Sequence, residues 1–347
     1  MNNDTIFALS SGFGKCGVSV IRVSGNDLSD MFKTLLGKSK FDARHAYFCN
    51  LRDKNGELLD QSVITFFKGP NSFTGQDVIE VYSHGAPAVV NAIFEYLKTF
   101  GARLANRGEF SQRAFYNNKM DLTDVDGLAA LLDAQTDMQR KTALKSMMGG
   151  DGKIYNTWRS KMIEIAAYSA AILDYDSDDL PINIGDKIKS QTNELLQEIS
   201  TALSHYKNSR AIRSGFNIVL VGETNVGKSS IFNCLVGSNR AIVSNTPGTT
   251  RDVVSAQLDI DGYLVNLSDT AGLRETNDNI EQMGIERTRA EIENANLVLR
   301  VETLDLQAKP NDNEILVINK SDLLKTKNNK DAIYVSAKTG DGINELT

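Results

Sequence analysis

The chain has 347 residues, of which 41% are hydrophobic and 24% are charged, and its formal net charge is −6. This composition is ordinary for a globular protein and excludes disordered, collagen-like and low-complexity chains, while the length predicts two or three domains. The acidic balance argues against a dedicated nucleic-acid-binding domain, which is normally basic.

Neither the start of the chain nor any helical pattern predicts export or insertion into a membrane. The first residues lack the basic and apolar regions of a signal peptide. The most apolar helical stretch, Ile163–Leu173, is well short of the roughly 20 residues that a bilayer span requires. The three cysteines form no CxxC pair, which argues against a zinc site and predicts reduced thiols. We therefore expect a cytoplasmic protein.

Residues 1–118 combine β-rich runs with one helical pattern. Val18–Val23, Ser62–Phe67 and Val78–Tyr82 are rich in apolar, β-branched and aromatic residues and are separated by Gly, Pro and Asn. Pro87–Phe100 carries apolar residues at helical spacing. This mixture predicts an α+β domain.

The hydrophobic period becomes helical between residues 119 and 210. Apolar residues recur at intervals of three and four within Leu122–Leu132, Ile154–Ala166 and Ile188–Leu203. Such stripes pack against neighbouring helices, so this stretch predicts a helical domain.

From residue 211 short apolar runs alternate with polar loops and helical patterns. The runs are Phe216–Val221, Leu264–Ser268, Leu297–Val301, Ile315–Ile318 and Ile333–Val335. This order predicts an α/β domain with a doubly wound, mostly parallel sheet, whose chemistry lies at the carboxyl ends of the strands.

The strongest motif is GETNVGKS at 222–229, which fits GxxxxGK[ST] and lies between a predicted strand and a helical pattern. The backbone N–H groups of such a loop, together with the positive end of the helix, bind phosphates. Lys228 would reach the β- and γ-phosphates, and Ser229 would ligate Mg²⁺. The nucleotide-binding residues predicted here are Asn225, Val226, Gly227, Lys228, Ser229 and Ser230.

Further motifs follow in the order that GTPases require. DTAG (269–272) comes directly after a predicted strand, where Asp269 can hold the Mg²⁺ water shell. NKSD (319–322) selects guanine, because the Asp322 carboxylate can accept two hydrogen bonds that adenine cannot donate. SAK (336–338) completes the base pocket, and Thr250 in GTTRD (248–252) is the predicted second Mg²⁺ ligand.

These motifs predict a Ras-like P-loop GTPase domain. Outside the P-loop, the predicted GTP-binding residues are Ser244, Asn245, Thr246, Pro247, Gly248, Thr249, Thr250, Asp269, Thr270, Ala271, Gly272, Asn319, Lys320, Asp322, Ser336, Ala337 and Lys338.

Hydrolysis needs a solution other than the glutamine of Ras-like proteins, because Leu273 stands directly after the DTAG motif. One solution is a monovalent cation held by Asn225 and the loop 244–249. The rival candidates are Arg251 and Arg274, as free arginines of the switch regions.

The G-domain strings VGETNVGKSS, AIVSNTPGTTRD and DTAGLRE resemble the tRNA-modification GTPase family called MnmE or TrmE. GPNSFTGQDVIEVYSHG (69–85) and RGEFSQRAFYNNKMDLTDVDGL (107–128) resemble the N-terminal and helical signatures of that family. The G motifs alone would also fit an Era- or Der-like switch GTPase that associates with RNA or the ribosome. A folate-dependent one-carbon transferase regulated by GTP is a third alternative.

The resemblance implies three domains. Residues 1–118 would form an N-terminal domain that binds 5-formyltetrahydrofolate and makes the homodimer contact, 119–210 a helical domain, and 211–347 the G domain. It implies folate binding by Arg22, Glu80 and Lys119. A carboxylate can pair with the amidine edge of the pterin, and basic groups with the glutamate tail.

The resemblance also implies a GTPase activated by potassium and by G-domain dimerisation. The K⁺ ligands would be Asn225, Ser244, Thr246 and Thr249, and Glu281 would orient the attacking water beside Lys228 and Thr250. With an FAD-containing partner called GidA or MnmG, the family installs an aminomethyl or carboxymethylaminomethyl group at C5 of the tRNA wobble uridine. GTP hydrolysis would drive a conformational cycle in that complex.

The chain departs from the family at its C-terminus. The family continues past the SAK motif into the last G-domain helix, further bundle helices and a C-terminal Cys-x-Gly-Lys. We therefore expect a C-terminally truncated member with an incomplete helical domain.

Overall fold

The computed structural model divides the chain into two compact units, Met1–Asp126 and Gly127–Thr347, each of which is described by itself. The structure describes residues 4–176, 181, 183–237, 241–242, 254–269, 290–303, 310–324, 326 and 329–346. Among the helices of these residues, none is both long enough and apolar enough to cross a bilayer.

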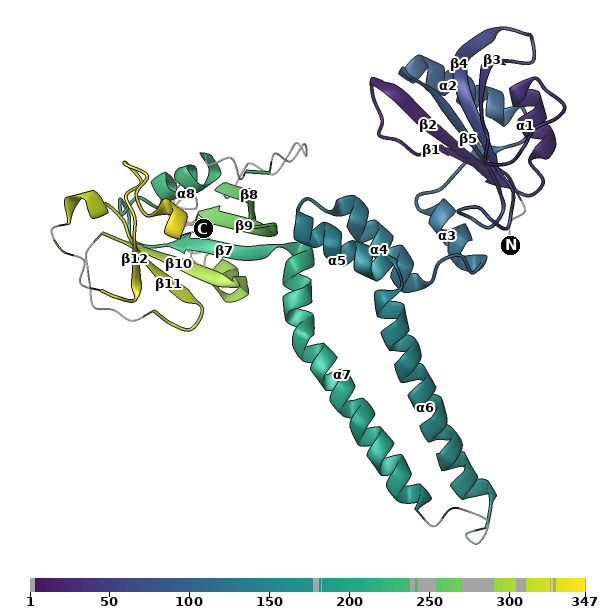
Figure 1. Cartoon of the computed structure of the whole chain (residues 1–347). Coiled ribbons are helices and arrows are strands. Elements are labelled where there is room, and N and C mark those ends of the chain that lie inside the picture. The colour runs from purple at the N-terminus through teal and green to yellow at the C-terminus, as the bar shows by residue number, and fades with distance from the viewer. Residues whose placement is uncertain are drawn as a thin grey trace, which may run out of the picture. The chain divides into compact units, whose positions relative to one another are not determined.

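The first unit is built on a mixed sheet with the strand order β3-β4-β5-β2-β1-β6 (Figure 1). Neighbouring strands are antiparallel except for β1 and β6, which are parallel. The strands are β1 (Ile6–Leu9), β2 (Cys16–Gly25), β3 (Ala46–Arg52), β4 (Leu58–Phe67), β5 (Asp77–Gly85) and β6 (Arg103–Leu104). The three β-rich runs of the sequence fall within β2, β4 and β5, so the predicted α+β class is confirmed.

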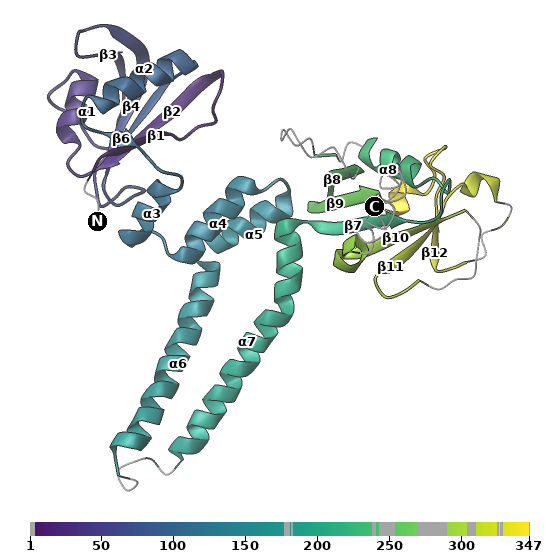
Figure 2. The same cartoon turned by 180° about the vertical axis from the view of Figure 1, so that it is seen from behind.

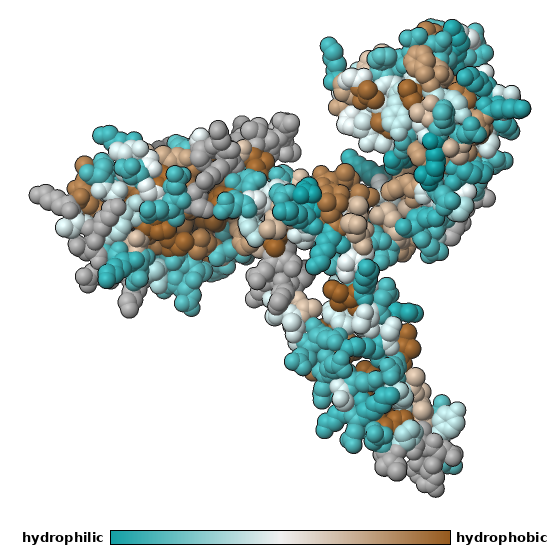
Figure 3. Space-filling view, in the orientation of Figure 1, coloured by the Kyte–Doolittle hydropathy of each residue, from teal (hydrophilic) through white to brown (hydrophobic). Residues whose placement is uncertain are grey.

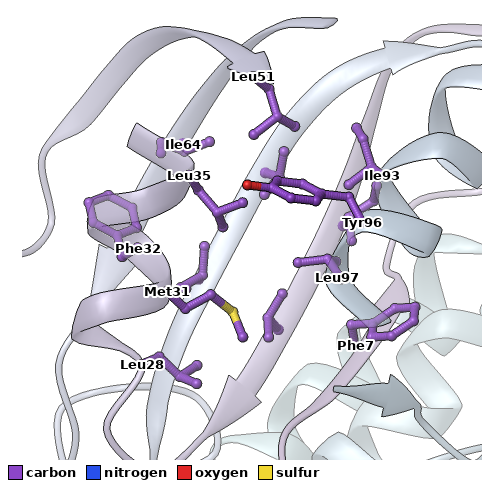
Figure 4. Packing of buried hydrophobic residues seen from close by; sticks show 14 of the residues in the cluster. Phe7, Leu28, Met31, Phe32, Leu35, Leu51, Ile64, Ile93, Tyr96 and Leu97 are labelled. Carbon is purple, nitrogen blue, oxygen red and sulfur yellow. The ribbon is translucent and has the colours of Figure 1, made fainter. Parts of the chain in front are cut away.

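Two helices, α1 (Ser29–Leu36) and α2 (Pro87–Lys98), bury their apolar faces against one side of this sheet. Figure 4 shows Leu35 and Leu97 pointing from the helices into the same core. Fully burying one such side chain stabilises the fold by about 1.5–3 kcal/mol. Because side chains alternate along a strand, the residues between the core positions lie on the opposite face of the sheet.

The first unit ends with α3 (Glu109–Tyr116), and α4 (Leu122–Asp133) begins within it. A charged network fastens α3 to the sheet edge. Glu109 accepts hydrogen bonds from Arg103 at 2.6 Å and from Arg113 at 3.0 Å. Asp4 accepts from both arginines, at 2.6 and 2.9 Å. These bonds, that from Arg103 foremost, hold the pKa of Glu109 at about 2.

The second unit contains most of the helical segment that the sequence predicts. α5 (Asp137–Met147) is followed by the long helices α6 (Gly150–Asp174) and α7 (Ile184–Ser214), which lie side by side in both views (Figures 1 and 2). Lys161 bridges the pair by donating to Glu194 at 2.8 Å and Glu198 at 2.7 Å. Apolar side chains also remain exposed on this pair, as the brown patches in Figure 3 show.

The second sheet has the order β12-β11-β10-β7-β9-β8. All of its pairings are parallel except β8–β9, which is antiparallel. The strands are β7 (Phe216–Val221), β8 (Val254–Ile260), β9 (Tyr263–Asp269), β10 (Leu297–Glu302), β11 (Glu314–Ile318) and β12 (Ala332–Tyr334), with α8 (Lys228–Gly237) and the short helices η3 (Ser321–Leu323) and η4 (Ile343–Glu345). The doubly wound, mostly parallel sheet is therefore confirmed.

The junction between α7 and β7 is held by two side-chain amides. Gln139 Nε2 donates to the carbonyl of Arg213 at 2.8 Å, and Asn266 Nδ2 donates to that of Ser214 at 3.0 Å. Both carbonyls belong to the last turn of α7, where intrahelical donors are missing. Gly215 turns the chain with φ +87°, and a Cβ there would lie 2.7 Å from Asn266 Nδ2. This junction fixes the strand that leads into the P-loop.

Candidate functional site

The P-loop follows the carboxyl end of β7 and leads directly into α8. Two glycines allow the loop to pack closely against the neighbouring strand ends. A Cβ on Gly222 would lie 2.2 Å from the carbonyl oxygen of Val301, and one on Gly227 would lie 2.2 Å from Asn319 Nδ2. Both have positive φ, as does Asn225. Only glycine combines the positive φ with the absence of a Cβ that positions 222 and 227 require.

Lys228 begins α8 and is 7% exposed. Its Nζ donates to the carbonyls of Gly222 at 3.0 Å and Glu223 at 2.8 Å, so its ammonium group lies inside the loop. A buried cation beside backbone N–H groups favours an anionic ligand, and a phosphate chain is such a ligand.

Ser229 and Asp269 meet from two elements. The Ser229 hydroxyl, at the start of α8, donates to Asp269 Oδ2 at 2.7 Å, and Asp269 ends β9 with 2% exposure. A hydroxyl and a carboxylate are oxygen ligands that suit Mg²⁺, which keeps several waters and takes the rest of its ligands from few protein groups and phosphates. The residues present therefore fit the ion that the motif implies.

The NKSD motif (319–322) is tied to the P-loop by side-chain hydrogen bonds. Asn319 Nδ2 donates to the carbonyl of Val226 at 2.9 Å, and its Oδ1 accepts from the N–H of Ala337 at 3.1 Å. Lys320 Nζ donates to the carbonyl of Asn225 at 3.1 Å. One asparagine thus joins the phosphate loop to the SAK segment at the carboxyl ends of the strands.

Asp322 lies at the exposed rim of this cluster, in η3. Ser336 is fully buried, and its hydroxyl donates to Asp322 Oδ1 at 2.7 Å, which fixes the direction of the carboxylate. Lys338 and Ser230 are both exposed.

Several predicted residues fall outside the described part of the chain. They are Ser244, Asn245, Thr246, Pro247, Gly248, Thr249, Thr250, Thr270, Ala271, Gly272 and Glu281. In the sequence these residues flank two described strands. β8 begins at Val254, and β9 ends at Asp269, directly before Thr270.

Replacing Gly227 by alanine is expected to weaken GTP binding by about tenfold or more, because strain of this kind costs roughly 1–3 kcal/mol and displaces Asn319. Binding of a fluorescent GTP analogue measures the effect. Gly237→Ala is the matched control, since a Cβ at that helical glycine meets no atom within 4 Å. Equal affinity of both variants would contradict the close packing of Gly227 on Asn319.

A second polar cluster lies on the open face of the first sheet. Arg22 on β2 stands directly across from Glu80 on β5. Its Nε donates to Glu80 Oε1 at 2.9 Å, and its Nη2 lies 2.8 Å from the same oxygen. The guanidinium lies 5.1 Å from the ring centre of Phe73 and 5.9 Å from that of Phe110. These rings and the carboxylate hold Arg22 in one orientation.

Lys119 borders the same region through the loop 72–76. The Thr74 hydroxyl hydrogen-bonds to that of Ser24 at 2.7 Å, two residues from Arg22 on β2. A Cβ on Gly75 would lie 3.3 Å from Lys119 Cε. The loop is thus in contact with both sides of the region to which the resemblance assigns the folate.

The sequence analysis missed Tyr82 and Phe110 in this region. The Tyr82 hydroxyl donates to Glu80 Oε2 at 2.6 Å. Burial, with this hydrogen bond, raises the pKa of Tyr82 to about 12. The period of two along a strand places Tyr82 on the same face as Glu80, and that signal could have found it. Phe110 carried no such signal.

Comparison with known proteins covers the whole chain. The family model described as the N-terminus of the GTP-binding protein TrmE matches residues 5–119, and that of the MnmE helical domain matches residues 122–347. A tRNA modification GTPase MnmE of Rhizobium etli (strain CIAT 652) is 42% identical over 353 residues, which cover 100% of this chain and 80% of that protein. The tRNA modification GTPase MnmE of Maricaulis maris (strain MCS10) is 40% identical, and the match covers 99% of this chain and 80% of that protein. That of Wolbachia pipientis subsp. Culex pipiens (strain wPip) is 41% identical, and the match covers 99% of this chain and 75% of that protein.

Proposed function

The chain belongs to the MnmE family of tRNA modification GTPases, and on that premise we propose that it hydrolyses GTP within the complex that installs an aminomethyl or carboxymethylaminomethyl group at C5 of the tRNA wobble uridine. The observation that carries the nucleotide assignment is the side chain of Asn319, which bonds the P-loop and the SAK segment at once. This arrangement supports binding of the phosphates and the guanine of one GTP molecule.

In this proposal each part of the site has one task. The P-loop N–H groups and Lys228 bind the phosphates, and the ammonium group stabilises charge that develops on the transferred phosphoryl group. Asp322 accepts hydrogen bonds from guanine. Ser229 and Thr250 hold Mg²⁺, with Asp269 beside it, and the ion supplies positive charge at the phosphates.

The cation K⁺ takes the place that an arginine finger has in other GTPases. Its proposed ligands are Asn225, Ser244, Thr246 and Thr249, all of which offer side-chain or backbone oxygens. Asn225 lies in the P-loop in the left-handed backbone conformation, with φ +64°. Glu281 orients the attacking water.

The first unit binds 5-formyltetrahydrofolate in this proposal. The open-face cluster offers the Glu80 carboxylate paired with the Arg22 guanidinium, and Lys119 packs against the loop 72–76 that borders them. These groups fit a ligand that has an amidine edge at one end and carboxylates at the other. The folate supplies the one-carbon unit for the modification.

The protein works in the cytoplasm as a homodimer with an FAD-containing GidA or MnmG partner, and the tRNA is bound through that complex. GTP hydrolysis drives a conformational cycle and is separate from the carbon chemistry. The family match over residues 5–119, outside the G motifs, favours this function over that of an Era- or Der-like switch.

The test is GTP hydrolysis in potassium against sodium buffer at several protein concentrations. We expect a potassium preference of about tenfold or more, because a fixed charge beside the phosphates stabilises the transition state. We also expect the rate per molecule to rise with protein concentration, because G domains pair. Equal rates in both salts, independent of concentration, would instead assign the missing charge to Arg251 or Arg274 in the same molecule.

A further inference from the structure

Tyr82 limits what Glu80 can offer to a ligand. A carboxylate has about four lone-pair sites on its two oxygens. In the described part of the chain, Arg22 covers Oε1, to which its Nε donates at 2.9 Å while its Nη2 lies at 2.8 Å. The Tyr82 hydroxyl takes one site of Oε2 at 2.6 Å. Glu80 therefore retains one acceptor site for a ligand, on Oε2.

An amidine edge presents two N–H donors side by side, and Glu80 alone can accept only one of them. The second acceptor must be close to Oε2. The hydroxyl oxygen of Tyr82 is the neighbouring atom, and its own proton is committed to the carboxylate. Its lone pairs therefore remain available as acceptors. The distance of 2.6 Å between the two oxygens is comparable with the spacing of the two nitrogens in an amidine.

We propose that Tyr82 is a specificity-determining residue of the folate site, in which its hydroxyl oxygen and Glu80 Oε2 together accept the ring N–H and the 2-amino group of the pterin. The inference rests on the proposed function, because it assumes that this cluster binds a folate. It assigns Glu80 a single ligand hydrogen bond where the family resemblance alone implied two.

The surroundings of Tyr82 support this arrangement. Burial and the bond to Glu80 raise the pKa of Tyr82 to about 12, so the hydroxyl keeps its proton and keeps donating it at neutral pH. Arg22 cannot release Oε1 easily, because Phe73 and Phe110 flank its guanidinium. Tyr82 follows Glu80 by two residues on β5, so both project from one face of a rigid sheet.

The test is isothermal titration of the full chain with 5-formyltetrahydrofolate and with its 2-desamino analogue. Tyr82→Phe removes the hydroxyl and leaves the ring. It should weaken binding of 5-formyltetrahydrofolate by about tenfold, since one hydrogen bond to a ligand donor is lost. The analogue lacks the 2-amino donor, so its affinity should change much less. Tyr47→Phe is the matched control, since it removes a hydroxyl that accepts from the N–H of Asp42 elsewhere in the same unit.

Each other outcome is decisive. If the wild type does not bind 5-formyltetrahydrofolate, the folate part of the proposed function fails, and this inference fails with it. If the wild type binds and Tyr82→Phe binds equally well, only the role of Tyr82 is overturned. If both ligands weaken equally, Tyr82 acts through the fold or through Glu80 and does not contact the 2-amino group. Thermal melting of each variant confirms that it is folded.

Discussion

Asp322→Asn should exchange the base preference of this protein from guanine to xanthine. In the proposed site the carboxylate accepts from the guanine N1–H and 2-amino group, and an asparagine would turn its own NH₂ toward one of these donors. A hydrogen bond to a charged group contributes about 1.5–3 kcal/mol, so the loss of one, with a donor left facing a donor, predicts a fall in GTP affinity of about 10- to 10²-fold. Xanthine carries a carbonyl in place of the 2-amino group and can accept from the asparagine.

The structure makes this exchange specific. Ser336 donates to Asp322 Oδ1 at 2.7 Å, and the Oδ1 of an asparagine can accept the same bond. The side chain therefore keeps its direction while its second atom changes from acceptor to donor. Competition of GTP and XTP against a fluorescent nucleotide measures the exchange, with Asp331→Asn, at an exposed turn, as the control. Unchanged GTP binding in Asp322→Asn would show that other residues read the base.

Glu109→Gln should destabilise the first unit by about 1–3 kcal/mol, because it removes the buried negative charge that Arg103 and Arg113 bind and leaves Asp4 as their acidic partner. Glu109 is 7% exposed and binds Arg103 and Arg113. It also accepts from the N–H of Asn106 at 2.8 Å, at the start of α3. Hydrogen exchange of peptides from β1 and α3 in the full chain measures the change. Glu95→Gln is the control, since Glu95 forms an exposed pair with Lys98.

The same carboxylate predicts a pH dependence with a definite sign. Its pKa falls from the ordinary 4.5 to about 2 in the folded protein, chiefly through the bond from Arg103. A lowered pKa stabilises the fold above the unfolded value of 4.5. That stability, about 3 kcal/mol, is lost as the pH falls from 4.5 toward 2. The first unit should therefore weaken across this range in the wild type and less in Glu109→Gln. Parallel pH profiles of both proteins would exclude the mechanism.

The nucleotide cluster could be predicted from the sequence because its signals are local. GETNVGKS, DTAG and NKSD each follow a recognisable apolar run, and parallel strands bring their carboxyl ends to one edge. The bond between Asn319 and Val226 joins residues 93 positions apart, yet the order of the motifs implied that they meet.

Other elements left little signal. β3 carries Tyr47, Phe48 and Cys49 in a row and so lacks the alternation of a half-buried strand, and α1 and α3 have only eight residues each, too few for a clear helical period. The charged network of Arg103 and Arg113 could not be predicted, because it depends on Asp4, which is 109 positions from Arg113. Likewise, the ring of Phe110 reaches Arg22 only through tertiary packing. Single side chains that meet by folding, and not by register or motif, escape the patterns of the sequence.

The amides of Gln139 and Asn266 at the end of α7 have a geometric consequence. They hold the last turn of a 31-residue helix to α5 and to β9, whose final residue, Asp269, bonds the P-loop serine. At 1.5 Å per residue this helix is about 46 Å long, so a tilt of about 10° at the junction would swing its far end by about 8 Å. A small rotation of β9 at this junction would therefore displace the far end of α7 by several ångströms.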